Sequence, residues 1–123
     1  MSPADLEDFF APFAKVNVRR MFSGHGIYVG TACFAISAFG TIWLKADADT
    51  EAAFAAAGCR PFSMTTPDGS TRTIRSFWSL PEPALDDAEA LKRWCGPALR
   101  AAQATALEHA AKKWKRVFAK SML

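Results

Sequence analysis

Residues 26–44 carry no formal charge, and this 19-residue run limits what the chain can fold into. A run of this length is long enough to cross a bilayer as one helix. Gly26, Gly30 and Gly40 instead divide it into short pieces rich in β-branched and aromatic residues, which is typical of strands. The run therefore predicts covered strands of a sheet, and we expect no membrane attachment.

The strand pattern begins before this run and resumes after it. Short apolar runs separated by Ser23-Gly24, Gly30 and Phe39-Gly40 predict an antiparallel meander. Pro67-Asp68-Gly69 suits a turn and predicts a second hairpin. The predicted strands are residues 18–22, 25–29, 31–37, 41–45, 61–66 and 72–80.

Two helices are predicted before the second hairpin. Residues 3–15 place four apolar side chains at helical spacing, and Ser2 is suited to cap their N-terminus. Residues 47–57 begin with acids, which the dipole at a helix N-terminus favours. They end at Gly58, and glycine readily adopts the left-handed conformation that closes a helix.

The C-terminal part predicts two more helices, separated by Gly96-Pro97. Asp86 or Asp87 is suited to cap the first, and Pro97 is expected to kink or interrupt it because proline lacks an N–H and clashes with the preceding turn. The second has an apolar side and a basic side. The apolar side comprises Leu107, Ala110, Ala111, Trp114, Val117 and Phe118, and the basic side Lys112, Lys113, Lys115, Arg116 and Lys120.

These elements predict one α+β domain of two layers. We expect an antiparallel sheet of five to six strands with helices packed on it, in the order helix, three or four strands, helix, two strands and two helices. The 123 residues are enough for one hydrophobic core. Residues 1–102 are expected to form the domain, and residues 103–123 a basic amphipathic helical extension of it.

Cysteine usage and the N-terminal sequence favour a reduced, cytoplasmic protein. Cys33, Cys59 and Cys95 are odd in number and contain no Cys-x-x-Cys, so neither a disulfide framework nor a zinc ribbon is predicted. The first residues are acidic and lack the basic and apolar regions of a signal peptide.

The stretch RRMFSGHGIYVG, residues 19–30, is the strongest motif candidate. Its glycine spacing misses the dinucleotide pattern by one residue, lacks a Walker lysine and leads into a strand rather than a helix, which argues against a phosphate loop. His25 has no neighbouring ligands, so no metal or cofactor is predicted.

A nucleophile pair formed by His25 and one of the cysteines is also possible, although no local sequence signature supports it. We favour a structural role in which Gly24 and Gly26 take positive φ at a hairpin or bulge.

Three groups of residues are candidates for binding. Arg19 and Arg20, with Lys45, suit an anion or an acidic partner, although solvated strand residues are the commoner explanation. The basic side of the C-terminal helix suits nucleic acid, or is a solvated face. The third group consists of aromatic residues that either stack on bases or belong to the core: Trp43, Phe77 and Trp78.

Five segments carry a family resemblance: RRMFSGHGIYVG, FAISAFGTIWLKAD, AAFAAAGCRPF, SFWSLPEPALDDAEALKRW and ALRAA. They are similar to the N-terminal domain of the TfoX/Sxy family, which is associated with natural competence and its gene regulation. The resemblance covers residues 9–102. Its hairpin signature comprises Met21, Phe22, Gly24, Gly26 and Tyr28. Ser23, His25 and Gly96-Pro97 depart from the family pattern, and a basic extension from Gln103 stands where full-length competence regulators have a further domain.

The resemblance implies a two-layer α+β domain in a regulatory family without an established catalytic centre or cofactor. We therefore expect a non-enzymatic regulatory or adaptor protein that acts through protein contacts. A homodimer that buries Leu107, Trp114 and Phe118 is one arrangement to test. The alternative is a nucleic-acid-binding protein that uses the basic C-terminal helix, with Arg19 and Arg20 as auxiliaries.

Overall fold

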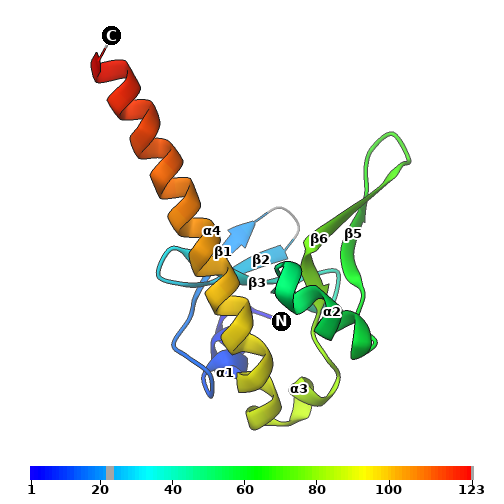
Figure 1. Cartoon of the computed structure of the whole chain (residues 1–123). Coiled ribbons are helices and arrows are strands. Elements are labelled where there is room, and N and C mark those ends of the chain that lie inside the picture. The colour runs from blue at the N-terminus through cyan, green and yellow to red at the C-terminus, as the bar shows by residue number, and fades with distance from the viewer. Residues whose placement is uncertain (22–23, 123) are drawn as a thin grey trace.

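The computed structural model describes the backbone of residues 1–21 and 24–122, and the side chains within those ranges except Met64 and residues 108–122. The helices are α1 (Pro3–Phe10), α2 (Ala48–Ala56), α3 (Pro83–Asp86) and α4 (Ala88–Met122). The strands are β1 (Asn17–Met21), β2 (Gly24–Val29), β3 (Ala32–Ala38), β4 (Thr41–Lys45), β5 (Pro61–Thr65) and β6 (Thr71–Ser79). Figure 1 shows their arrangement, with the C-terminal part of α4 and the tip of the β5–β6 hairpin extending from the body of the domain.

The strands form one antiparallel sheet in the order β1-β2-β3-β4-β6-β5. The predicted α+β class, the meander and the second hairpin are confirmed. At the β3–β4 turn, Phe39 and Gly40 both have positive φ, 54° and 72°. Paired positive φ angles mark the tight hairpin turn whose twist matches that of the strands it joins, and glycine takes the second position without a steric cost.

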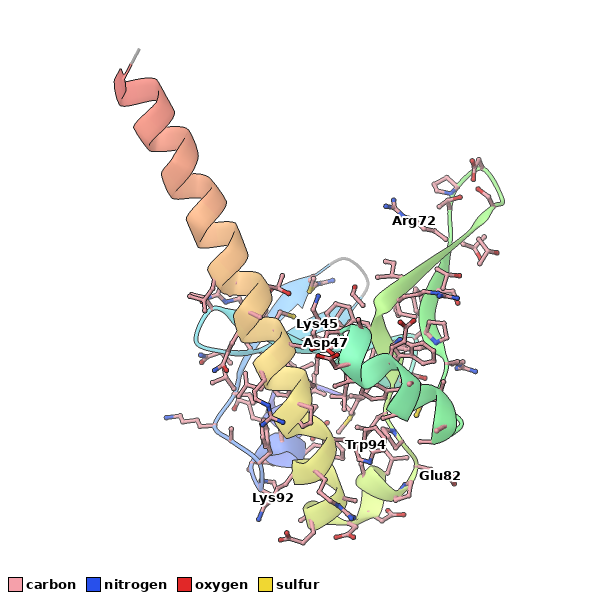
Figure 2. The ribbon with its side chains drawn as sticks, viewed as in Figure 1. Lys45, Asp47, Arg72, Glu82, Lys92 and Trp94 are labelled. Atoms are coloured by element: carbon pink, nitrogen blue, oxygen red, sulfur yellow. The ribbon has the colours of Figure 1, made fainter. Side chains whose placement is uncertain are left out.

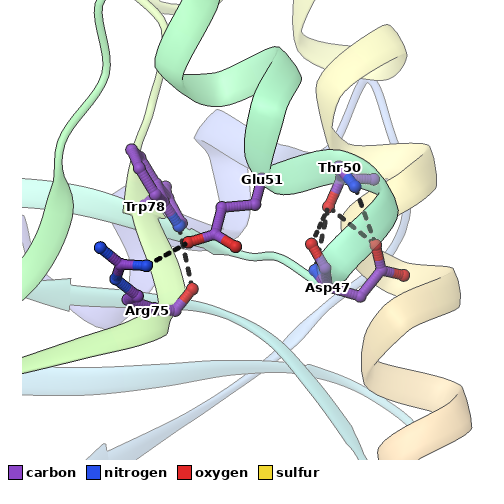
Figure 3. Close-up of polar contacts among 5 residues, drawn as sticks. All are labelled: Asp47, Thr50, Glu51, Arg75 and Trp78. Carbon is purple, nitrogen blue, oxygen red and sulfur yellow. Dashed lines mark hydrogen bonds and ion pairs between the residues drawn. The ribbon is translucent and has the colours of Figure 1, made fainter.

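Local capping explains where the helices begin. Ser2 accepts a hydrogen bond from Asp5 N and forms a capping box at α1. Asp47 accepts from the backbone N–H groups of Asp49 and Thr50 at α2, and the Thr50 hydroxyl accepts from Asp47 N (Figure 3). Asp87 accepts from Glu89 N at α4. The predicted caps Ser2 and Asp87, the latter one of two candidates, are confirmed, and Asp47 is a further cap that the structure adds.

Helix α1 is shorter than predicted. It ends at Phe10 rather than at residue 15, and residues 11–13 form a turn in which Phe13 N donates to Phe10 O at 2.9 Å. Pro12 has no N–H with which to continue the helical hydrogen bonds. Phe13, the last of the four apolar residues at helical spacing, still packs on the core, where its ring centroid lies 5.5 Å from that of Phe34.

The predicted break at Gly96-Pro97 is wrong. Helix α4 runs through Pro97, and the division between the last two helices falls at Asp87. The missing N–H of Pro97 leaves the carbonyl of Arg93 without its usual helical partner. Burial on both sides of the proline compensates, because Cys95 and Ala98 lie within the core at 0% and 1% exposure.

One face of the sheet carries the main core, to which all four helices contribute. On that face Phe10 of α1 meets the ring of Phe34 edge-on at 5.5 Å. The ring of Phe54 in α2 stacks on that of Trp78, and its centroid lies 5.0 Å from that of Trp94 in α4. Figure 2 labels Trp94. Packing a sheet face against helices is the standard way for a two-layer domain to bury its apolar residues.

A peripheral contact joins α2 to β6 beside this core. Arg75 Nη1 lies 3.8 Å from Glu51 Oε1, and the indole Nε1 of Trp78 donates to Arg75 O at 2.9 Å (Figure 3). Because the Arg75 side chain is 78% exposed, the ion pair adds little free energy. The indole hydrogen bond matters more, since it satisfies the polar atom of a buried ring.

The register assigns residues to the two faces. Leu44 pairs with Trp78 and both belong to the main core, whereas Trp43 pairs with Ser79. Since neighbouring side chains on a strand point to opposite faces, Trp43 lies on the face away from the helices. There it belongs to a second, smaller cluster made only of strand residues among those described: Ala38, Trp43 and Phe62, with Ile36, Ile74 and Phe77 packed against them.

Within residues 1–21 and 24–122, none of the helices combines the length and the apolar character that crossing a membrane requires. The uncharged run of residues 26–44 folds into most of β2, all of β3 and most of β4. The strand interpretation of that run is therefore confirmed.

We predict that Pro97→Ala stabilises the protein by about 1–3 kcal/mol, because alanine restores the missing helical hydrogen bond and has a far higher helix propensity. Urea unfolding followed by circular dichroism measures the change. Pro83→Ala is the matched control, since Pro83 lies at the first position of α3 where proline costs nothing, and little or no stabilisation is expected. A Pro97→Ala variant less stable than the parent would contradict an uninterrupted α4.

Candidate interaction surface

We call the sheet face away from the main core the open face. Its central residues are those of the second cluster. Tyr28 joins them because its neighbour Ile27 pairs with Ala35 in the main core, so Tyr28 and its cross-strand partner Cys33 point the other way. The described residues of the open face are Arg19, Tyr28, Cys33, Ile36, Trp43, Lys45, Arg60, Phe62, Ile74 and Phe77.

Three cations lie over aromatic rings on the open face. The Arg19 guanidinium is 5.2 Å from the centre of the Tyr28 ring, and Lys45 Nζ is 5.2 Å from that of Phe77. The Arg60 guanidinium is 5.6 Å from the centre of the Trp43 ring. Such contacts hold a cation against the ring while its charge still reaches solvent. The face is therefore both apolar and positively charged.

An exposed aromatic residue lies at one end of this face. Phe39, in the positive-φ turn between β3 and β4, is 64% exposed and stacks on Phe62 at 6.2 Å. Phe62 in turn meets Trp43 edge-on at 5.0 Å. Trp43 Nε1 donates to Ala38 O at 3.2 Å, which satisfies the buried indole. The stack on Phe62 fixes the position of the Phe39 ring while most of the ring stays exposed to solvent.

The six strands contain no acidic residue. They carry five cations, Arg19, Arg20, Lys45, Arg72 and Arg75, whereas every Asp and Glu of the chain lies in helices or connecting segments. Of these cations, Arg75 is already paired with Glu51 from α2 (Figure 3). Arg72 lies on the hairpin that extends from the domain (Figure 2). An acid-free sheet produces a positive potential that attracts anionic groups.

A cavity of about 290 Å³ forms where α4 passes the open face. Cys33, Lys45 and Phe77 line it from the sheet, and Ala102 and Thr105 from α4. Ala102 also belongs to the main core, so α4 passes from the covered side of the sheet towards the open side at this point. The C-terminal part of α4 therefore borders the open face.

Gly24 and Gly26 are needed for close approach, which corrects the prediction that they take positive φ. Both lie in β2, and positive-φ glycines occur instead at Gly30, Gly40, Gly58 and Gly69. A Cβ on Gly24 would come within 2.0 Å of Ser37 O, a backbone atom that cannot move aside easily. A Cβ on Gly26 would meet Met21 Sδ at 2.7 Å and Tyr28 Cε1 at 2.8 Å. Gly24 thus lets the backbone of β3 come close to β2, and Gly26 leaves room for the side chains of Met21 and Tyr28.

The structure separates the cations that the sequence grouped. Arg19 and Lys45 share the open face. The side chains of neighbouring residues in β1 point to alternate faces, so Arg20 and its cross-strand neighbour His25 lie on the opposite face. Arg20 and His25 instead line a cavity of about 410 Å³ with the residues of the β3–β4 turn. The predicted three-residue anion site of Arg19, Arg20 and Lys45 does not form.

The aromatic stacking candidates divide in a similar way. Trp78 belongs to the main core, and Trp43 is 4% exposed beneath Arg60. Phe77 is half-buried on the open face. Of the predicted apolar side of the C-terminal helix, Leu107 is 71% exposed and does not pack on the domain.

Several predicted residues lie outside the described part of the chain. Phe22 of the hairpin signature is one of them. The backbone of α4 is described to Met122, but the side chains of residues 108–122 are not, and these include Trp114, Phe118, Lys112, Lys113, Lys115, Arg116 and Lys120.

No thiol is activated for nucleophilic attack. Burial raises the pKa of Cys95 to about 12 and raises the pKa values of Cys33 and Cys59. His25 and Cys33 lie on opposite faces, since His25 pairs with Ser37 and Cys33 with Tyr28 across the bulge. Among the residues whose positions are described, no group of three His, Cys, Asp or Glu side chains is placed to hold a metal ion.

Sequence reasoning missed Arg60, Phe39 and Phe62. Arg60 lies just before β5 and reaches Trp43 only because β5 is brought next to β6 and β6 next to β4. That long-range order leaves no local sequence signal. The exposure of Phe39 could have been predicted from the sequence, because a large aromatic residue in a turn, just before glycine, has its side chain in solvent.

A family model described as the TfoX N-terminal domain matches residues 8–102 of this chain. The match spans the sheet and the part of α4 that packs on it, and it ends where α4 passes the open face. A comparison with curated proteins finds no match.

We predict that the three thiols react more slowly with iodoacetamide than a free cysteine does, because a raised pKa lowers the thiolate fraction at a given pH. For Cys95, whose pKa is raised to about 12, the thiolate fraction at pH 8 is lower than that of an ordinary thiol on the order of a thousandfold. Its alkylation rate is expected to fall by the same factor. Peptide mapping by mass spectrometry gives each rate, with urea-unfolded protein as the control. Labelling of Cys33 or Cys59 faster than free cysteine would instead support a cysteine–histidine nucleophile.

Proposed function

Because the chain belongs to the TfoX N-terminal domain family, we propose that it is a regulatory or adaptor protein that acts through protein contacts made by its open face. One observation carries this proposal. The main core lies between the helices and one side of a six-stranded sheet, and the other side, which α4 borders, keeps half-buried apolar residues beside exposed cations. Apolar surface rimmed by polar groups is typical of a protein interaction site.

The process that we propose is the regulation of natural competence, with which the family is associated. A regulator of this kind needs a surface for a partner rather than a catalytic centre. Phe39 is the most suitable anchor, because a rigid exposed aromatic residue supplies much contact area at little entropic cost. The proposal treats the protein as non-enzymatic and cytoplasmic.

Gene deletion followed by transcript profiling in the source organism tests this function. We predict that deletion changes a defined set of transcripts, including genes for DNA uptake, and that the parent chain restores them. Phe39→Asn is expected not to restore them, since asparagine tolerates positive φ and removes only the exposed ring. Leu85→Asn is the matched control, because Leu85 is similarly exposed at 53% on α3.

The outcomes separate two parts of the proposal. An unchanged transcript profile after deletion would contradict a regulatory role. Full restoration by the Phe39→Asn variant would leave regulation in place but contradict Phe39 as the anchor of the contact.

Nucleic-acid binding is the second candidate function, and charge distribution favours it. The strands contain no acid, and residues 109–123 carry five cations without one. Binding through phosphate contacts would weaken steeply with salt, with a slope of about 0.9 in log units for each contact on duplex DNA.

Fluorescence anisotropy of labelled single- and double-stranded DNA tests this candidate. If the basic segment carries binding, the full-length variant with Lys112, Lys113, Lys115, Arg116 and Lys120 all changed to Gln loses affinity and shows a shallower salt slope. A variant with the same number of changes among exposed cations elsewhere provides the comparison. No binding of either DNA at low salt excludes this function.

A further inference from the structure

We infer that the open face binds an acidic amphipathic helix of a partner protein. The inference rests on the proposed function, since it names the chemistry of the partner that the open face recognises. Three properties of the face carry it: the sign of its charge, the apolar residues between the charges, and the backbone requirement that a bound segment must meet.

The charge of the face selects an anionic partner. Arg19 and Arg60 are exposed and Lys45 is half-buried, each held over a ring. Within the part of the chain whose side chains are described, the two ion pairs involve Arg75 and Lys92, so these three cations have no carboxylate of their own. Contact with the rings fixes their positions before binding, which reduces the entropic cost of forming a new ion pair.

The apolar residues select a protein rather than a nucleic acid. Ile36, Ile74 and Phe77 are half-buried between the cations, and Phe39 is exposed beside them. Aliphatic side chains gain free energy against other apolar side chains and gain nothing against phosphates. Binding a single strand by base stacking needs a series of uncovered rings, but the rings of Tyr28, Phe77 and Trp43 each already have a cation over them, which leaves Phe39 as the exposed ring among the described residues of this face.

The backbone requirement selects a helix. A segment lying on the face of a sheet meets only side chains, because the strands use their own N–H and C=O groups within the sheet. An extended segment would therefore leave its backbone polar groups unpaired where the face excludes water. A helix satisfies these groups internally and can present to the face an apolar side with acids along its borders.

The size of the face sets the length of the helix. From Arg19 on β1 to Arg60 beside β5 there are five strand spacings, which is about 24 Å at the usual separation of strands. A helix of about 16 residues covers that span. The cations at the two ends and Lys45 between them meet acids spaced along such a helix.

The test uses a fluorescein-labelled peptide of about 18 residues, with leucine and alanine on one helical side and glutamates along both borders of that side, from which they reach the face. A peptide with lysine in place of glutamate is its partner probe. Anisotropy titrations at moderate salt are expected to show binding of the glutamate peptide and not of the lysine peptide. The triple variant Arg19→Glu, Lys45→Glu and Arg60→Glu is expected to weaken binding on the order of 10- to 100-fold.

A matched variant controls for net charge. Lys15→Glu, Arg93→Glu and Arg100→Glu change the total charge by the same amount at exposed positions away from the open face. It is expected to weaken binding by no more than about threefold, the effect of long-range attraction alone. In the parent protein, the peptide should shift the methyl resonances of Ile36 and Ile74 but not those of Ile27 and Ile42, which keeps the test valid if the triple variant fails to fold.

Three results overturn the inference: no binding of the glutamate peptide, equal weakening by both triple variants, or methyl shifts at Ile27 and Ile42 instead. A single-stranded oligothymidine that binds in its place, and is released by the open-face triple variant, would assign the face to nucleic acid. The proposed function fails separately, through an unchanged transcript profile after deletion.

Discussion

The packing of helices against one face of the sheet determines the rest of this structure. Phe10, Phe34, Phe54, Leu44 and Trp78 meet in the main core with almost no exposure, so most of the apolar area buried on folding lies on that side. The helices, once placed there, leave most of the other face to the strands, and only α4 borders it at Ala102 and Thr105 among the described side chains. That face stabilises itself through the smaller cluster around Trp43 and Phe62, whose rings meet edge-on.

This one-sided arrangement explains why cations and aromatic residues occur together on the open face. On a sheet face that no second layer covers, the aromatic rings need other side chains to shield them from solvent. Arg19, Lys45 and Arg60 do this by laying their apolar stems and cationic heads over the rings of Tyr28, Phe77 and Trp43. The same groups leave a positive potential that no acid within the strands offsets. Stability of the free protein and attraction for an acidic partner thus come from the same contacts.

Local signals made much of the fold predictable. Ser2, Asp47 and Asp87 cap helices through hydrogen bonds to nearby backbone groups, so their roles can be deduced from short stretches of sequence. Every described strand end lies within one residue of its predicted position, because turn residues and apolar runs are also local.

Features that depend on long-range packing were not predictable. Pro97 continues α4 because neighbouring residues are buried against the sheet, which no helix propensity describes. The reason for glycine at position 24 is Ser37 O on the next strand. Side chains alternate between the two faces along β1, so Arg19 and Arg20 lie on opposite faces. Which of the two lies on the covered face follows only from the packing of the helices. Arg60 reached Trp43 through the β4-β6-β5 order.

The central claim is that one face of the sheet is covered and the other is open, and the four isoleucines of the chain test it directly. Ile27 and Ile42 lie in the main core at 0% and 7% exposure, whereas Ile36 and Ile74 pack against the second cluster on the open face. Methyl NMR with a soluble gadolinium chelate measures how closely solvent approaches each one. The structure predicts strong broadening of the Ile36 and Ile74 methyl resonances and sharp resonances for Ile27 and Ile42. Equal protection of all four would contradict the claim, because it would mean that another layer covers the open face.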